Sequence, residues 1–293
     1  MYNEKTLLSK LWVFGLFGGI PTFAFVMVVL VPFVIGFYLT FTDSGALVSF
    51  NLIGLYNYRH AFGDAHFWNA FGVTARYVFF TVLLTNGVAM GLALLVSSEI
   101  KGQNFFRVGF FTPNLIGGII LGYIWQFIFI RMVPFVGQAL NIPFLSSSWL
   151  ADPGRALWAL VLVSVWQGSG YMMLIYTAGL MGIPNNLLEA ADLEGATGLE
   201  KLFKIKVPLM VPSFTISLFL TIRNSFMVYD LNVALTEGGP FRSTEMMSLQ
   251  IFNEAFTRRN FATAQSQAMI LFAIVAMITV AQVLAMKKLE VEL

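Results

Sequence analysis

Long apolar runs without charged residues dominate the chain. A membrane-spanning helix needs about 20 such residues, and runs of that length predict spans over residues 20–41, 77–98, 108–130, 158–181, 208–229 and 264–286. Six spans would leave both termini on one side of the membrane. We therefore predict an all-α polytopic membrane protein that forms one transmembrane domain over residues 1–293.

Composition supports a membrane environment and excludes several classes of site. Hydrophobic residues make up 58% of the chain and charged residues only 11%, which is less than half the usual share in soluble domains. A net charge of +2 without a basic block gives no support to a nucleic-acid partner. The absence of cysteine excludes disulfides, thiolate metal sites and cysteine nucleophiles. His60 and His66 have no acidic cluster beside them in the sequence, so neither a metal site nor a catalytic residue is expected.

Loop charges indicate the orientation of the spans. Lysine and arginine accumulate in cytoplasmic loops near span ends, and every lysine lies on the side of the termini: Lys5, Lys10, Lys101, Lys201, Lys204, Lys206, Lys287 and Lys288. Most arginines lie on or near the other side, which weakens the bias. The lysines predict cytoplasmic termini.

The inner loop over residues 182–206 differs from the apolar runs around it. Pro184, followed by Asn185, is typical of a helix start, and Gly195 and Gly198 predict a break, so two short helices at a bend are expected. The helices are amphipathic and carry a ridge of small residues that suits a groove on a partner protein: Ala190, Ala191, Gly195 and Ala196. An ordinary interfacial helix that joins two spans is the alternative from periodicity alone.

The order of residues in this loop resembles a known motif. The string IPNNLLEAADLEGATGLEKLFKIKVPLMVP over residues 183–212 resembles the EAA loop of bacterial ABC-importer permeases, with its conserved positions at Ile183, Pro184, Glu189, Ala190, Ala191, Gly195, Ala196, Phe203, Ile205 and Pro208. GLYNYRHAF at 54–62, FFRVGFFTPNLIGGIILGYIW at 105–125 and LTEGGP at 235–240 resemble further landmarks of the carbohydrate-importer branch, the maltose and glycerol-phosphate type. Glu194 stands where this family most often has Asp, which retains the carboxylate.

The resemblance implies a type I ABC importer permease fold in a bacterial or archaeal cytoplasmic membrane. It implies three partners: a second permease subunit, a dimeric ATPase that binds ATP and Mg²⁺, and a solute-binding protein outside the membrane. The residues expected to couple to the ATPase are Glu189, Ala190, Ala191, Asp192, Glu194, Gly195 and Ala196, and those expected to contact the binding protein are Gly238, Gly239 and Pro240. This chain has no phosphate-binding loop of the G-x-x-x-x-G-K-[ST] type, so we expect no bound cofactor and no enzymatic activity of its own.

Polar residues inside the spans indicate where a solute could bind. In the fifth span, Thr221, Asn224 and Ser225 share one helix face, and in the fourth span the same holds for the set Gln167, Gly168 and Tyr171. Hydroxyls, amides and an aromatic ring suit a sugar. Hydrogen bonding between packed helices is the alternative role. The resemblance to the maltose importer implies sugar-lining positions at Tyr171, Thr221, Asn224 and Ser225.

Two further expectations follow from the fifth span. Because this span follows the EAA loop directly, we expect one continuous helix to carry motion from the loop to Thr221 and Asn224. Arg223 is expected to pair with an acidic residue of a partner or to extend toward the membrane surface rather than to bind solute.

The predicted function is the permease subunit of an ATP-driven importer for a sugar or oligosaccharide. An ion-coupled secondary transporter is the alternative, although Arg223 is the one ionisable residue in a predicted span that could serve such a relay.

Overall fold

The computed structural model describes residues 14–43, 51–98 and 102–290. Within these ranges the structure is helical without a named strand, which confirms the all-α prediction. Five described helices are long and apolar enough to cross a membrane: Phe17–Leu39, Ala65–Ser97, Gly118–Ala139, Pro153–Met181 and Phe261–Lys287. A bent pair, Gly198–Leu209 with Val211–Phe226, makes six if it is one span. The helix content therefore agrees with a six-span membrane protein.

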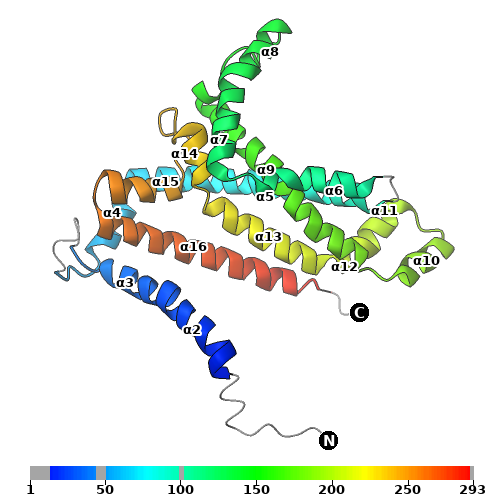
Figure 1. Cartoon of the computed structure of the whole chain (residues 1–293), viewed down its shortest axis with the longest axis horizontal. Helices are drawn as coiled ribbons and strands as arrows, with labels where there is room; N and C mark the ends of the chain where they lie inside the picture. The colour runs from blue at the N-terminus through cyan, green and yellow to red at the C-terminus, as the bar shows by residue number, and fades with distance from the viewer. Residues whose placement is uncertain (1–13, 44–50, 99–101, 291–293) are drawn as a thin grey trace, which may run out of the picture. The chain divides into compact units, whose positions relative to one another are not determined.

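The described residues divide into two compact units. Their helices are labelled in Figure 1. The first comprises the described parts of residues 1–64 and 251–270, with elements η1 (Phe14–Gly19), α2 (Ile20–Phe25), η2 (Val26–Leu30), α3 (Val31–Leu39), α4 (Tyr56–Gly63) and η7 (Asn253–Thr257). In it, Asn57 on α4 donates hydrogen bonds of 2.8 Å to the carbonyl oxygens of Thr40 and Thr42. These bonds fix α4 at the end of the first long helix.

The second unit comprises residues 65–250 and the described part of 271–293. Its elements are α5 (Ala65–Ser97), α6 (Gln103–Phe111), η3 (Thr112–Leu115), α7 (Gly118–Phe127), η4 (Ile128–Met132), α8 (Val133–Ala139), η5 (Trp149–Ala151), α9 (Pro153–Met181), α10 (Asn185–Leu193), α11 (Gly198–Lys201), η6 (Leu202–Lys206), α12 (Val207–Leu209), α13 (Val211–Phe226) and α14 (Asp230–Thr236). The helices α15 (Met247–Phe252) and α16 (Phe261–Lys287) have residues in both units.

Three helices, α5, α9 and α13, pack against one another and form the body of the second unit. Helix α9 starts where Asp152 Oδ1 accepts the N–H groups of Gly154 and Arg155 at 2.9 Å, with Pro153 at the first helical position. At the loop end of α5 and α9 lies the inner core cluster, which we define as Ala89, Ala93, Val96, Met172, Met173, Tyr176, Ile183 and Met210. This dry cluster joins the three helices to the start of the EAA loop.

The prediction of one continuous helix over residues 108–130, the third span, is wrong. The chain leaves α6 through the 3₁₀ turn η3, becomes extended at Ile116 and Gly117, and enters α7 only at Gly118. Pro113 cannot donate a backbone hydrogen bond, and Gly117 has a low helix propensity. Gln167 on α9 donates to the released Ile116 carbonyl at 2.9 Å, which stabilises the break. The long helix is Gly118–Ala139.

The fifth predicted span, residues 208–229, is also interrupted. Helix α13 begins only at Val211 and meets the helical segment Gly198–Leu209 at an angle of 69°. Met210 lies at the bend, between Pro208 and Pro212, and each proline lacks the N–H that a continuous helix would use. The expectation of one continuous helix from the EAA loop to Thr221 is therefore wrong.

Candidate solute cavity and coupling loop

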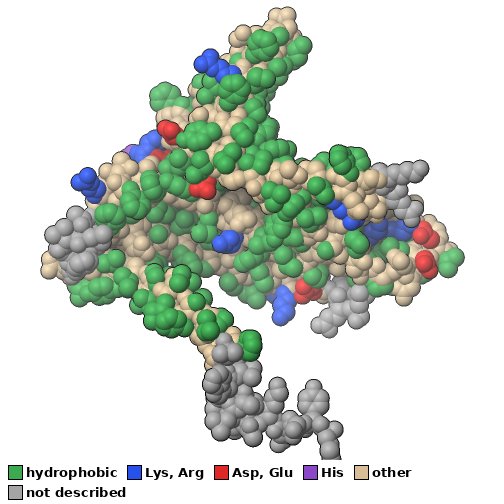
Figure 2. Space-filling model, in the orientation of Figure 1, with side chains coloured by type: hydrophobic (Ala, Val, Ile, Leu, Met, Phe, Trp, Pro, Cys, Tyr) green, Lys and Arg blue, Asp and Glu red, His purple; other side chains and the backbone are tan. Residues whose placement is uncertain are grey.

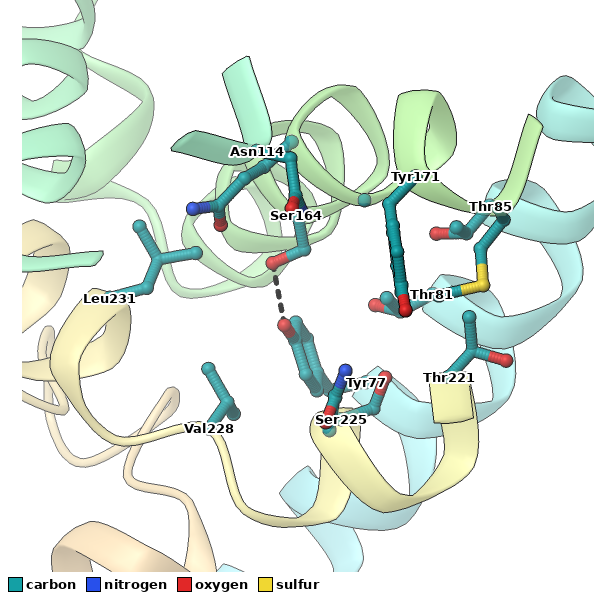
Figure 3. A pocket seen from close by; sticks show the side chains of 14 residues that line it. Tyr77, Thr81, Thr85, Asn114, Ser164, Tyr171, Thr221, Ser225, Val228 and Leu231 are labelled. Atoms are coloured by element: carbon teal, nitrogen blue, oxygen red, sulfur yellow. Dashed lines mark hydrogen bonds between the residues drawn. The ribbon is translucent and has the colours of Figure 1, made fainter. Parts of the chain in front are cut away.

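A cavity of about 270 Å³ opens among α5, α9 and α13 (Figure 3). Its lining is mixed polar and apolar and consists of Tyr77, Thr81, Thr85, Asn114, Ser164, Gln167, Gly168, Tyr171, Met172, Thr221, Asn224, Ser225, Val228 and Leu231. All six residues predicted from the fourth and fifth spans line it. The structure thus brings together two groups that are about 50 residues apart in sequence.

Helix α5 contributes a third wall that the sequence analysis missed. Tyr77, Thr81 and Thr85 recur every four residues, so they share one helix face. The Tyr77 hydroxyl lies 2.6 Å from Ser164 Oγ (Figure 3). Thr85 is only 2% exposed, and its hydroxyl has no hydrogen-bond partner among the described residues. The sequence signal that could have identified this wall is the spacing of four residues between its hydroxyl side chains within an apolar run.

Two of the predicted residues hold helices together, as the alternative role anticipated. Gln167 uses its amide on the Ile116 carbonyl. Thr221 Oγ1 donates to the Ser217 carbonyl at 2.7 Å and accepts from Asn86 Nδ2 at 3.0 Å. Both still line the cavity, but their polar groups are largely used within the protein.

Other lining groups remain open to a ligand. The Tyr171 side chain is 39% exposed. Asn224 is exposed, and its Oδ1 accepts a bond of 3.3 Å from Nη1 of the neighbouring Arg223, which leaves its amide N–H₂ available. Together these two side chains offer an N–H₂ donor, a hydroxyl and an aromatic face. Such a set can bind a hydroxyl-rich molecule. No charged side chain is among the described residues that line the cavity.

The EAA loop forms two short helices at a bend, as predicted. Helix α10 ends at Leu193, Gly195 has a positive φ of 78°, and α11 begins at Gly198. Positive φ is costly for residues with a Cβ, so the bend depends on Gly195. Lys201 Nζ on α11 lies 2.5 Å from Asp192 Oδ1 on α10, which closes the angle between the two helices.

A capping box starts α11. The Thr197 hydroxyl accepts from Glu200 N at 3.3 Å, and Glu200 Oε2 accepts from Thr197 N at 2.9 Å. The bond from the Thr197 backbone, assisted by Lys204, lowers the pKa of Glu200 to about 2. Because this pKa is depressed, the box contributes stability above the ordinary pKa of 4.5 and loses it as the pH falls toward 2.

The surface of the loop is suited to a protein partner. Glu189, Ala190, Asp192, Glu194 and Gly195 are exposed and Ala196 is half-buried, whereas Ala191 is buried at 7% and packs within this chain. Ala191 therefore has little surface to offer a partner, and its role in coupling stays a prediction. Three large apolar side chains are also exposed: Leu193 (91%), Leu199 (69%) and Phe203 (66%). The sequence analysis named Phe203 as a motif position but did not select Leu193 or Leu199. Acidic and basic side chains gather over α10 and α11 (Figure 2).

The segment 237–244, which includes the residues expected to contact the binding protein, forms a turn. Glu237 and Gly238 have positive φ angles of 51° and 81°, and Gly239 N donates to the Thr236 carbonyl at 2.8 Å. Thr244 Oγ1 donates to the Gly239 carbonyl at 2.6 Å. Gly238 is buried against Glu245 and Leu249, while Pro240 is half-buried. The neighbouring Phe241, at 93% exposure, is the more accessible residue.

Metal binding has no support in the part of the chain that the structure describes. Across residues 14–43, 51–98 and 102–290, no three His, Asp or Glu side chains are grouped closely enough to bind a metal ion.

Related proteins share this sequence over nearly its whole length. The chain is 40% identical over 291 residues to a probable starch degradation products transport system permease protein, AmyD, of Thermoanaerobacterium thermosulfurigenes, covering 99% of both chains. It is 31% identical over 290 residues to the multiple sugar-binding transport system permease protein MsmF of Streptococcus mutans, covering 98% of this chain and 99% of that one. No family model matches the sequence.

Solved structures share the fold. A bacterial ABC transporter involved in the import of the acidic polysaccharide alginate superposes with a TM-score of 0.83 at 16% identity, covering 97% of this chain and 99% of that one. A bacterial alginate ABC transporter in complex with an alginate pentasaccharide-bound periplasmic protein gives a TM-score of 0.80 at 17% identity, covering 95% and 96%. At this identity the structures establish the fold, and the sequence relatives establish the family. The chain is a member of the sugar ABC-transporter permeases, a family of membrane-spanning transport subunits.

Proposed function

We propose that this chain is the permease subunit of an ATP-driven, binding-protein-dependent importer for a neutral sugar or oligosaccharide. The observation that carries this proposal is the polar cavity, because it gathers all six predicted solute residues within one packed unit. Family membership favours this function over an ion-coupled secondary transporter.

The lining of the cavity supports the choice of solute class. Its described residues offer hydroxyls, amides and the ring of Tyr171, but no lysine or arginine to balance a phosphate or carboxylate. A neutral sugar therefore fits better than a phosphate-bearing polyol. The printed functions of the relatives, transport of starch degradation products and of multiple sugars, agree with this class.

The proposed mechanism assigns ATP chemistry to a separate subunit. A dimeric ATPase binds ATP and Mg²⁺ and receives α10 and α11 in a groove, with Leu193, Leu199 and Phe203 as apolar anchors. Closure of the ATPase dimer displaces the loop, and the cavity alternates between inward and outward access. The residues 189–196 act as the docking segment.

The remaining partners complete the pathway. A second permease subunit covers the open side of the cavity, where Tyr171 and Asn224 are exposed. A solute-binding protein contacts the turn at Gly238, Gly239 and Pro240, with Phe241 as an added contact. The complex resides in a bacterial or archaeal cytoplasmic membrane with the termini and the EAA loop on the cytoplasmic side.

The test is uptake by the complete complex in proteoliposomes. Labelled glucose, maltose, maltotriose and glycerol 3-phosphate are supplied with the binding protein, with ATP inside or with a proton gradient alone. We expect ATP-dependent accumulation of a neutral sugar, and reduced uptake when Asn224→Ala is introduced. Accumulation driven by the gradient without ATP, or an Asn224→Ala complex with unchanged substrate range and uptake, would contradict the proposal.

A further inference from the structure

Asn86 on α5 is a buried polar residue that binds three helices at once. Its Oδ1 accepts from the Tyr176 hydroxyl on α9 at 2.5 Å and from Ser217 Oγ on α13 at 2.6 Å. Its Nδ2 donates to Thr221 Oγ1 on α13 at 3.0 Å and to the Val82 carbonyl at 2.8 Å. The amide thus makes all four hydrogen bonds available to it, two through each end. We call the side chains of Asn86, Tyr176, Ser217 and Thr221 the three-helix joint.

The three-helix joint lies between the cavity and the inner core cluster. On one side, its member Thr221 and the neighbouring Thr85 line the cavity. On the other side, Tyr176 belongs to the inner core cluster together with Met210. Tyr176 and Ser217 are fully buried, and Asn86 is 9% exposed. A satisfied polar network in such a dry setting fixes one arrangement of the helices.

The inner core cluster is in turn connected to the EAA loop. Ile183, just before α10, is a cluster member, and Leu188 on α10 packs against the cluster. The direct route along the fifth span is bent by 69° at Met210, and Met210 is itself buried in the cluster. Displacement of α10 therefore acts on α5, α9 and α13 through shared side chains rather than along one straight helix.

We propose that Asn86 is a positioning residue that makes the three helices around the cavity move together when the EAA loop is displaced. This inference rests on the importer function proposed above. Without the joint, α13 can shift relative to α5 and α9, so the ATPase turns over while the cavity walls respond incompletely. The loss is then a loss of coupling, measured as solute molecules imported per ATP hydrolysed.

The experiment compares variants of the reconstituted complex. Asn86→Leu alone leaves two buried hydroxyls without their acceptor, which lowers stability by itself. The triple variant Asn86→Leu, Tyr176→Phe and Ser217→Ala removes those groups together, so it is expected to recover the thermal stability of the complex. Thr177→Val is the matched control, because Thr177 is equally buried on α9 beside Tyr176 and its hydroxyl has no partner among the described residues.

Solute imported per ATP hydrolysed is the decisive readout. We expect the number of solute molecules imported per ATP to fall about threefold or more in the triple variant. Thr177→Val should keep the wild-type value. Tyr176→Phe leaves Asn86 Oδ1 bonded to Ser217, so its import ratio should lie between those of the triple variant and Thr177→Val. This variant replaces the triple variant in the test if the triple variant does not assemble. A stable triple variant, or a stable Tyr176→Phe complex, with the wild-type ratio would overturn the role of Asn86. If the wild-type complex hydrolyses ATP without importing any tested sugar, the importer function fails instead.

Discussion

Threonine residues of α5 have two different roles that the structure separates. The Thr74 hydroxyl donates to the Ala70 carbonyl at 2.7 Å and accepts from Met247 N at 2.9 Å, so it connects two helices. The Thr85 hydroxyl is just as buried but has no partner among the described residues, although the residue lines the cavity. One threonine supports the fold, and the other leaves a buried hydroxyl unpaired in the cavity wall.

Replacement of these two threonines by valine should have opposite effects. Thr85→Val replaces an unpaired buried hydroxyl by a methyl group, so thermal stability should stay unchanged or rise. Thr74→Val leaves Met247 N–H unpaired and costs about 1–3 kcal/mol of stability. Thermal unfolding of the purified complexes measures both. A Thr85→Val complex that unfolds at a clearly lower temperature than wild type would show that this hydroxyl does have a partner.

Gly195 offers a test of the bend in the EAA loop. A Cβ there meets no atom within 4 Å, so substitution acts only through the backbone, whose φ of 78° costs about 1–2 kcal/mol for an L residue. Gly195→Val should reduce co-purification of the ATPase by about tenfold. Gly198→Ala is the control, because that site is equally open and has an ordinary φ. Equal ATPase recovery from both variants would show that the bend is unimportant for docking.

At the scale of elements, α6 and α9 approach each other closely at Gly170. A Cβ on Gly170 would lie 1.9 Å from the Phe110 carbonyl oxygen, which is backbone and cannot rotate away. Gly170→Ala must therefore displace α6 and should cost about 1–3 kcal/mol. Gly168→Ala, one of whose nearest atoms is Thr85 Cγ2 at 3.4 Å, should keep wild-type stability. Thermal unfolding of the two complexes measures the difference, and equal melting temperatures would refute the close contact.

Hydrophobic runs predicted the existence of the long helices but not their interruptions. Proline and glycine are tolerated within spans, because neighbouring helices can satisfy the freed backbone groups. Whether Pro113 and Gly117 break the helix therefore depends on Gln167, which lies about 50 residues further along the chain and donates to Ile116. The bend at Met210 likewise depends on packing in the inner core cluster. Periodicity along one helix carries no information about such partners.

At the scale of the whole molecule, the sequence predicted the shape of the EAA loop well but predicted the walls of the cavity only in part. The EAA loop is a local motif, so its two helices and its bend followed from neighbouring residues. The cavity is assembled from three helices, and the sequence predicted the walls on α9 and α13 but not the one on α5. Asn86 was missed because its partners Tyr176 and Ser217 are 90 and 131 residues away. A single amide in an apolar run has no spacing pattern that would reveal its partners.

We propose that a separate ATPase drives this permease through residues 189–196. The most direct measurement is ATP-dependent sugar uptake by proteoliposomes that contain the complete complex, with either wild-type permease or Gly195→Asp. We expect wild-type vesicles to accumulate sugar only with ATP. We expect Gly195→Asp to lose both uptake and membrane association of the ATPase while the permease remains folded. Survival of both uptake and association in Gly195→Asp would contradict it.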